Sequence, residues 1–161
     1  FIRLCDTFRI PIVSLVDEPG FLIGPDAERA GTILHGTEAV LATTESKVPW
    51  TTIMIRKSFG VAAAAHYGPD GYVLAWPSAE SGPLPLEGGV AVAFKKEIAS
   101  AKNPEAKRKE LEEKMAKNQS PFPRAEAFSV HEIIDPRETR KYIALWAERI
   151  QSQLKASLMN R

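Results

Sequence analysis

Two runs of apolar and β-branched residues constrain the fold of this chain most strongly: residues 10–16 (IPIVSLV) and residues 50–55 (WTTIMI). Such near-continuous runs are typical of strands that are buried on both faces, as in a parallel sheet covered by helices. Residues 26–45, which lie between the two runs, are compatible with a helix, and Pro49 ends helical geometry before the second run begins. The sequence therefore predicts an α/β fold.

The rest of the first hundred residues continues this alternation. We expect the end of an amphipathic helix at residues 1–8, a short loop at 56–60, the start of a helix at 61–66 and a third strand at 72–76. A loop rich in proline and glycine at 77–89 leads to an apolar run at 90–94. Because no methionine and no helix cap precede Phe1, we expect the chain to be part of a longer protein.

A charge-dense segment, residues 95–118, is predicted to form a surface helix. Asn103 can cap this helix, and Pro104 can take its first position. Glu110 and Glu113 each stand four residues before a lysine, a spacing that stabilises an exposed helix. A solvated surface helix is the simpler interpretation, and a helix that docks a partner or binds an anion is the alternative.

The C-terminal part is predicted to form an amphipathic helix over residues 137–158, after an extended linker at residues 120–123. Asp135 can cap this helix, and Pro136 suits its first turn. Apolar residues recur along it at spacings of three and four: Ile143, Trp146, Ile150, Leu154 and Leu158. This stripe either packs inside the chain or forms a subunit interface.

Composition excludes several classes of function. The 161 residues include 21 basic and 20 acidic ones, so a net charge of +1 supplies no general attraction to nucleic acid or anionic lipid. No apolar run is long enough to span a membrane. Cys5 is the single cysteine, and no His or Cys cluster has the spacing of metal ligands. We therefore expect one domain in the cytoplasm, or in the mitochondrial matrix of a eukaryote, with no metal, nucleic-acid partner or membrane partner.

Two glycine-bearing junctions, where a predicted strand meets a helix, are the candidate sites: residues 16–24 and residues 56–62. Backbone N–H groups at such turns can hold an anion or a developing oxyanion. Neither junction matches a phosphate-binding or dinucleotide motif, and on this pattern alone each could equally be a structural turn. Ser58, His66 and Asp70 lie close in sequence, but no nucleophile elbow surrounds the serine, so a hydrolytic triad is not favoured.

Several ordered blocks resemble the carboxyltransferase subunits of biotin-dependent acyl-CoA carboxylases. Residues 17–24 (DEPGFLIG), followed by Glu28 and Gly31, are similar to the family pattern Asp-x-Pro-Gly-Phe-x-x-Gly-x-x-x-Glu-x-x-Gly. Residues 56–60 (RKSFG) resemble the family's Arg-Lys-x-Tyr-Gly segment. Further blocks that match in order are residues 75–80, 88–90, 121–123, 133–136 and 139–140. The resemblance thus covers residues 1–140.

The resemblance implies a fold and partners. Subunits of this family consist of two crotonase-like domains in tandem, so residues 1–161 would form the C-terminal carboxyltransferase domain, a single α/β domain with a crotonase/ClpP-like ββα superhelix. The N-terminal domain, which carries much of the acyl-CoA site, would be a partner. Biotin would arrive on a biotin carboxylase or biotin carrier subunit, because the chain contains no Met-Lys-Met attachment motif. A homo-oligomer is expected.

The resemblance also implies a reaction and its residues. The carboxyl group would move from carboxybiotin to the α-carbon of a short-chain acyl-CoA, such as acetyl-CoA or propionyl-CoA, with the biotin nitrogen as the base. The backbone amides of Val61 and Ala62 would stabilise the oxyanion of the biotin ureido group, and Ala63 and Ala64 would meet the acyl-CoA substrate. The residues of the biotin pocket would be Pro19, Gly20, Phe21, Gly24 and Gly60.

Two departures from the family pattern affect this site. Val61 replaces a glycine, which keeps the N–H donor but adds a branched side chain that narrows the approach to it. Ala63 and Ala64 stand where propionyl-specific members tend to carry Tyr and Asp, so the identity of the acyl group stays open. Two alternatives to a carboxylase also stay open: a non-catalytic module that binds the biotin carrier or assembles oligomers, and a subunit of an acyl-CoA decarboxylase.

Overall fold

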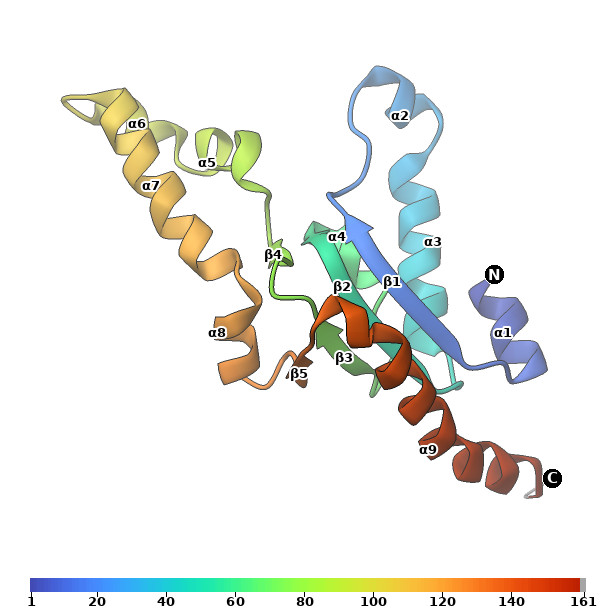
Figure 1. Ribbon diagram of the computed structural model, residues 1–161. Coiled ribbons are helices and arrows are strands. Elements are labelled where there is room, and N and C mark those ends of the chain that lie inside the picture. Colours follow the sequence, from blue (N-terminus) through green and yellow to red (C-terminus); the bar gives the residue numbers. More distant parts are fainter. Residues whose placement is uncertain (160–161) are drawn as a thin grey trace.

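The computed structural model describes residues 1–159, apart from the side chains of residues 87, 153 and 156–159. A parallel sheet lies at its centre (Figure 1). Its main strands follow the order β1 (Ile12–Glu18), β2 (Trp50–Phe59), β3 (Tyr72–Ala75) and β5 (Glu132–Ile133). A further strand, β4 (Glu80–Gly82), pairs in parallel with the end of β2. The predicted α/β fold with a parallel sheet is therefore confirmed.

Helices connect and cover these strands. The N-terminal half contains α1 (Ile2–Phe8), α2 (Pro25–Arg29), α3 (Thr32–Glu45) and α4 (Gly60–Ala64). The C-terminal half contains α5 (Leu86–Ala93), α6 (Lys95–Ser100), α7 (Pro104–Gln119), α8 (Pro121–Glu126), the 3₁₀ turn η1 (Pro136–Glu138) and α9 (Thr139–Met159). In the view of Figure 1, α3 lies behind the sheet, and the start of α9 lies in front of it. None of the described helices combines the length and the apolar character that a membrane span requires.

The core lies on both faces of the central strands. Ile53 of β2 and Leu74 of β3 are fully buried and belong to a cluster that includes Ile143 of α9. Their chain neighbours Met54 and Ala75 point to the opposite face and are buried as well. This arrangement follows from the alternation of side chains along a strand, and it explains why the second apolar run contains almost no exposed position.

The first apolar run, in contrast, is buried on one face only. Ile12 and Val16 are buried, whereas Val13 and Leu15 are exposed. The expectation that both faces are buried is thus wrong for the described part of the chain, because the face of β1 that carries Val13 and Leu15 stays exposed there.

The prediction of a loop at residues 56–60 is also wrong, because β2 continues to Phe59 and α4 begins at Gly60. Pairing on two sides holds this polar end of the strand. Ser58 pairs with Glu18 of β1 after a shift in register, and residues 57–59 pair with β4. Hydropathy does not reveal a strand of this kind, since pairing rather than apolar burial extends it.

Three other boundaries differ from the expected ones. Residues 120–123 form the start of α8 instead of a linker: Ser120 Oγ accepts the N–H of Phe122 at 3.4 Å, and the two prolines fall in the first turn, where helical N–H groups have no carbonyl partner. The helix expected at residues 26–45 is divided into α2 and α3 at Gly31, which adopts a φ of 71°. The apolar run at 90–94 lies at the end of α5.

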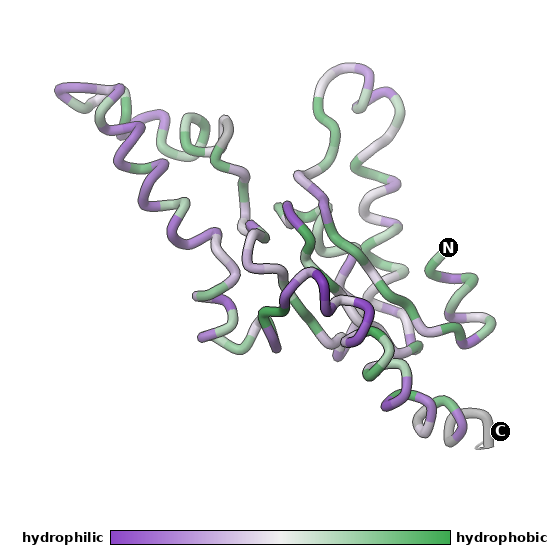
Figure 2. Tube along the Cα trace, viewed as in Figure 1, coloured by the Kyte–Doolittle hydropathy of each residue, from purple (hydrophilic) through white to green (hydrophobic). Residues whose placement is uncertain are grey.

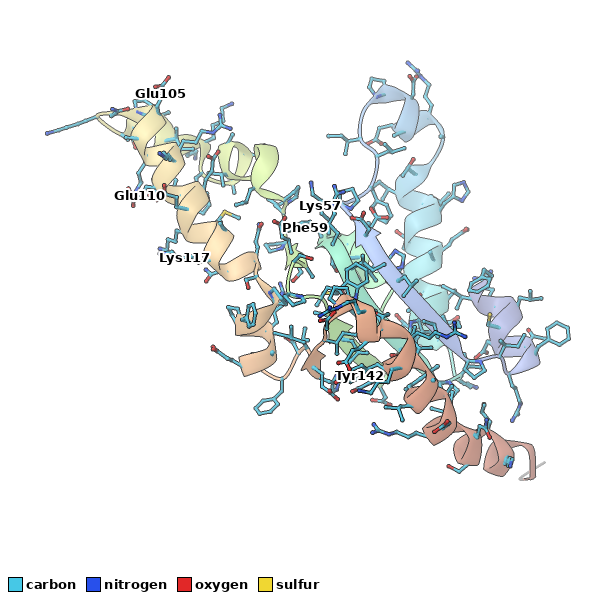
Figure 3. The ribbon with its side chains drawn as sticks, viewed as in Figure 1. Lys57, Phe59, Glu105, Glu110, Lys117 and Tyr142 are labelled. Carbon is cyan, nitrogen blue, oxygen red and sulfur yellow. The ribbon has the colours of Figure 1, made fainter. Side chains whose placement is uncertain are left out.

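Helices α5, α6 and α7 form an arm that extends away from the sheet (Figure 1). Asn103 caps α7 as predicted, since its Oδ1 accepts the N–H of Ala106 at 3.1 Å. Leu111 is buried, but most of α7 is hydrophilic (Figure 2). Exposed charged residues such as Glu105, Glu110 and Lys117 lie along it (Figure 3). Ion pairs join Lys107 to Glu97 and Glu110, and Arg108 to Glu112.

The helix expected at residues 137–158 corresponds to η1 and α9. Asp135 Oδ1 accepts the N–H of Arg137 at 2.9 Å, and Trp76, just after β3, donates its Nε1–H to Thr139 Oγ1 at 2.9 Å. Two of the ordered sequence blocks therefore contact each other at the start of α9. Along the apolar stripe, Trp146 and Ile150 are buried, Ile143 and Leu154 are half-buried, and the side chain of Leu158 lies outside the described residues.

Candidate functional site

The two glycine-bearing junctions lie at the same end of the sheet, where β1 and β2 finish; below, we call this end the edge of the sheet. β1 and β2 are parallel neighbours, and Glu18 at the end of β1 pairs with Ser58 near the end of β2. A loop, residues 19–24, follows β1, and α4 follows β2 (Figure 1). Lys57 and Phe59 mark this edge in Figure 3. The parallel topology thus places the start of the loop beside the start of α4.

Acidic side chains at the end of β1 fix this junction. Asp17 Oδ1 accepts the N–H of Lys57 at 3.1 Å and lies 3.7 Å from Nε of Arg56. Glu18 Oε1 accepts the N–H of Gly20 at 2.9 Å. Both carboxylates are therefore used to hold the backbone at the edge of the sheet.

The loop after β1 then turns away from α4. Pro19 is exposed, and Gly20 follows it with a φ of 128°. The ring of Phe21 lies against Gly36 of α3, where an added Cβ would overlap it. Gly24 precedes α2 at the far end of the loop. Of the loop residues expected to contact biotin, the structure brings Pro19 and Gly20 to the junction, whereas Phe21 packs on α3 and Gly24 starts α2.

The start of α4 presents backbone donors at the same edge. Gly60 adopts a φ of 64°, a left-handed conformation that glycine tolerates. The N–H groups of Val61 and Ala62 belong to the first turn of α4, where no carbonyl lies one turn earlier to accept them. Ala62 is buried, whereas Val61 is 67% exposed. Thr43 Oγ1 of α3 donates to the carbonyl oxygen of Ala65 at 2.9 Å and so fixes the end of α4.

A cavity of about 250 Å³ lies between α4 and α8, and we call it the α4–α8 pocket. Ala63 and Ala64, the residues expected to meet the acyl group, line it together with Gly60. The polar residues of its lining are Ser58, Tyr67, Ser81, Arg124 and Ser129. Because they come from β2, β4, α8 and the segments that follow α4 and α8, only the folded chain brings them together.

Several polar groups of the α4–α8 pocket are buried. Ser58 Oγ and the Tyr67 hydroxyl lie 2.7 Å apart and share a hydrogen bond. Burial raises the pKa of Tyr67, and the hydrogen bond with Ser58 and the charge of Arg124 lower it in part. Tyr67 is therefore a neutral O–H donor at pH 7. Ser81 Oγ and Arg124 Nε are buried without a hydrogen-bond partner in the described part of the chain.

The three residues considered for a hydrolytic triad do not meet. Ser58 is bonded to Tyr67, whereas His66 Nδ1 lies 3.0 Å from Ser14 Oγ. Asp70 lines a separate and larger hollow between α1 and α9, at the opposite edge of the sheet. Among the side chains that the structure describes, no three from His, Cys, Asp or Glu are grouped so that they could hold a metal ion.

Sequence reasoning did not identify Tyr67, Ser81 or Arg124 as site residues. Arg124 directly follows the block at residues 121–123, and Tyr67 follows the small residues of α4, but neither position carries a motif. Their common signal is burial of a polar group, and it becomes visible only when β4 and α8 are placed beside α4.

Residues 1–160 match the family described as the carboxyl transferase domain. The carboxyltransferase subunit of propionyl-CoA carboxylase from Haloferax mediterranei is 38% identical over 161 residues, covering 97% of this chain and 31% of that protein. The alpha subunit of methylmalonyl-CoA decarboxylase from Propionigenium modestum is 39% identical over 148 residues, covering 89% of this chain and 28% of that protein. The chain thus spans less than a third of the length of these relatives.

The fold is also similar to that of a solved carboxyltransferase. The crystal structure of transcarboxylase 12S, a hexamer with methylmalonyl-coenzyme A and methylmalonic acid bound, superposes with a TM-score of 0.83 and 39% sequence identity. The likeness covers 94% of this chain and 30% of that one. The crotonase-like fold expected from the sequence is therefore confirmed.

Proposed function

Because the chain belongs to the carboxyl transferase domain family, we propose that it supplies one half of a site that transfers a carboxyl group from carboxybiotin to the α-carbon of a short-chain acyl-CoA. Acetyl-CoA and propionyl-CoA are the simplest substrates of this class. The observation that carries the proposal is the start of α4, where backbone donors face the edge of the sheet beside the loop after β1. Bound carboxybiotin would supply the carboxyl group.

The amides of Val61 and Ala62 suit the negative charge of a ureido oxygen. Donors at the start of a helix are held rigidly, carry partial positive charge and need no side chain. The exposed side chain of Val61 stands at the surface beside these donors, and Gly60 adds no side chain. This donor set fits a ureido group and gives the chain one task in the reaction, which is to hold an oxyanion. It requires no protein nucleophile.

We assign the remaining expected residues by their place in the fold. An added Cβ on Gly20 would meet no atom within 4 Å, so the backbone of Gly20 is open to approach, and we assign the biotin ring to this junction beside Pro19 and Gly20. Phe21 and Gly24 would act indirectly, by fixing the course of the loop. Ala63 and Ala64 would contribute to the acyl site through the α4–α8 pocket that they line.

Other protein parts would complete this site. The relatives named above are roughly three times as long as this chain, so we assign acyl-CoA binding chiefly to a second crotonase-like domain. Biotin would be delivered by a biotin carboxylase or biotin carrier subunit, and the whole would assemble as a homo-oligomer. A net charge of +1 agrees with this division, because the chain offers little general attraction for the phosphates of coenzyme A.

The donor assignment can be tested by replacing Ala62 in the two-domain subunit proposed above, which we call the full-length protein. Ala62→Pro removes one N–H donor, and Ala62→Gly is the matched control that keeps it. We expect carboxyl transfer to fall about 100-fold or more in Ala62→Pro, as when an oxyanion donor is lost, and to stay close to the unaltered rate in Ala62→Gly. Circular dichroism would check that both variants fold, since Ala62 is buried. Equal rates in the two folded variants would contradict the assignment.

A second candidate is the reverse chemistry, decarboxylation of an acyl-CoA. It is favoured by the identity of 39% with a relative named as a decarboxylase subunit. Both reactions would use the same donors, so Ala62→Pro does not separate them. The complete enzyme can be assayed with acyl-CoA and with carboxylated acyl-CoA. Measuring whether biotin loses or gains a carboxyl group in each assay distinguishes the two directions.

A further inference from the structure

The α4–α8 pocket contains donors that no group of the described chain accepts. Ser81 is only 4% exposed, and its Oγ is buried without a hydrogen-bond partner. Arg124 Nε is likewise buried without a hydrogen-bond partner in the described chain. A polar group that is buried without a partner is unfavourable, and a charged one more so, because each has lost its bonds to water. Both groups therefore point to a ligand that accepts hydrogen bonds.

The pair formed by Ser58 and Tyr67 adds another donor. Two hydroxyl oxygens 2.7 Å apart share a single hydrogen, so the hydroxyl that accepts this bond keeps its own hydrogen free. Burial raises the pKa of Tyr67, so its hydroxyl stays protonated at neutral pH, and the pair keeps one O–H that can be donated to a ligand in the pocket that both residues line. The lining thus combines an O–H of this pair, the Ser81 hydroxyl and the Arg124 guanidinium.

The charge and size of the pocket narrow the class of ligand. Among the described residues that line it, Arg124 is the one that carries a charge, and none of them is an Asp or Glu that would neutralise the guanidinium. A guanidinium with nearby hydroxyls matches a carboxylate, whose two oxygens accept several hydrogen bonds. A water takes up about 30 Å³ in the liquid, so 250 Å³ corresponds to about eight waters, which is enough for a short organic acid. Met54, Val73 and Val130 line the pocket with apolar groups that suit a short carbon chain.

We propose that the α4–α8 pocket binds the carboxylate of a short organic acid. Two sources share this chemistry: a free acid such as malonate, and the carboxylated acyl group of an acyl-CoA such as malonyl-CoA. The second source rests on the proposed function, because it requires the acyl group to reach Ala63 and Ala64.

Titration of the full-length protein with malonate tests the proposal, with malonamide as the uncharged control at equal ionic strength. We expect malonate to bind and malonamide not to bind. Arg124→Gln should weaken malonate binding about tenfold or more, as expected for a hydrogen bond to a charged group, and Ser81→Ala should weaken it by a smaller factor. Arg3→Gln, the same substitution at an exposed position of α1, is the matched control and should change nothing.

A second titration separates the two sources. If the acyl group is the ligand, malonyl-CoA should bind more tightly than acetyl-CoA, and Arg124→Gln should abolish this preference while Arg3→Gln keeps it. Ser81→Ala keeps the test decisive if Arg124→Gln does not fold, because it removes one hydroxyl from the same pocket. The proposal is overturned if neither malonate nor the carboxylate of malonyl-CoA adds to binding, or if the pocket variants bind as tightly as Arg3→Gln.

These titrations contain no biotin, so they are independent of carboxyl transfer. A protein that transfers carboxyl groups but shows no preference for a carboxylate would retain the proposed function and lose the pocket assignment. A protein that binds malonate through Arg124 but transfers nothing would retain the pocket and lose the proposed function.

Discussion

Gly36 shows how a single position without a side chain can shape the candidate site from a distance. It lies inside α3, where alanine would normally be the better helix former, yet the ring of Phe21 occupies the space that a Cβ would need. Phe21 in turn belongs to the loop that starts beside α4. The contact between Phe21 and Gly36 therefore anchors the loop after β1 to α3.

We predict that Gly36→Ala in the full-length protein lowers carboxyl transfer about tenfold or more while changing the free energy of unfolding by about 1 kcal/mol or less. The gain in helix propensity offsets part of the cost of displacing the Phe21 ring, whereas the displaced loop shifts Pro19 and Gly20. Steady-state rates and thermal unfolding measure the two effects. Phe21→Ala should also lower transfer, since it removes the same anchor. Normal transfer in both variants would show that this contact does not position the site.

At the scale of single residues, the sequence predicted the turn and helix start of the candidate site better than the polar side chains that surround them. Small residues after a strand marked Gly60, Val61 and Ala62, because a turn and a helix start leave a local signal. Ser81 and Arg124 left none, since their place in the pocket arises from contacts between segments that are far apart in the sequence, such as β4 and α8. The sequence alone does not distinguish a polar residue that is exposed from one that is buried in a pocket.

At the scale of elements, predictions succeeded at two helix caps and failed at the end of β2 and at the start of α8. Asn103 and Asp135 cap helices as expected, because a cap depends on the next few residues only. The polar end of β2 was missed because β1 and β4 hold it from both sides. The start of α8 at residues 120–123 was predicted as a linker because of its two prolines, although both prolines fit the first turn of a capped helix.

The cap at Asp135 leads to a prediction on pH. Its side-chain hydrogen bonds with Arg137, aided by the N–H of Arg137, lower the pKa of Asp135 from 3.8 to about 2. A carboxylate with a lowered pKa stabilises the folded state above pH 3.8 and loses this contribution as the pH falls through about 2. We expect Asp135→Asn, which keeps a cap but no charge, to be less stable than the unaltered protein at pH 7, with a difference that shrinks between pH 4 and 2.

Asp135→Ala serves as the companion variant, since it loses the cap as well as the charge. Thermal unfolding of the three proteins from pH 2 to 7 should rank it lowest at pH 7. A difference between Asp135→Asn and the unaltered protein that is constant over this range would contradict the role of the ion pair with Arg137.

At the scale of the whole molecule, the described chain exposes apolar surface where an isolated domain would normally cover it. Val13 and Leu15 of the edge strand are 39% and 54% exposed, and Ile10 before it is 49% exposed. Exposed apolar side chains that gather in one region are typical of interfaces. The candidate donors lie at one end of the same sheet, so a domain that covered β1 would also stand next to the junction between β1 and α4.

This arrangement predicts a division of labour between residues 1–161 and the rest of the proposed subunit. Expressed alone, the chain should show no detectable carboxyl transfer from carboxybiotin to acyl-CoA, because the acyl-CoA site would lie mainly on the absent domain. The full-length protein, assayed in parallel, should transfer. Circular dichroism of the isolated chain would show whether lost activity reflects lost structure. Transfer by the folded isolated chain would overturn the division, and absence of transfer in both proteins would favour a non-catalytic module that binds the biotin carrier.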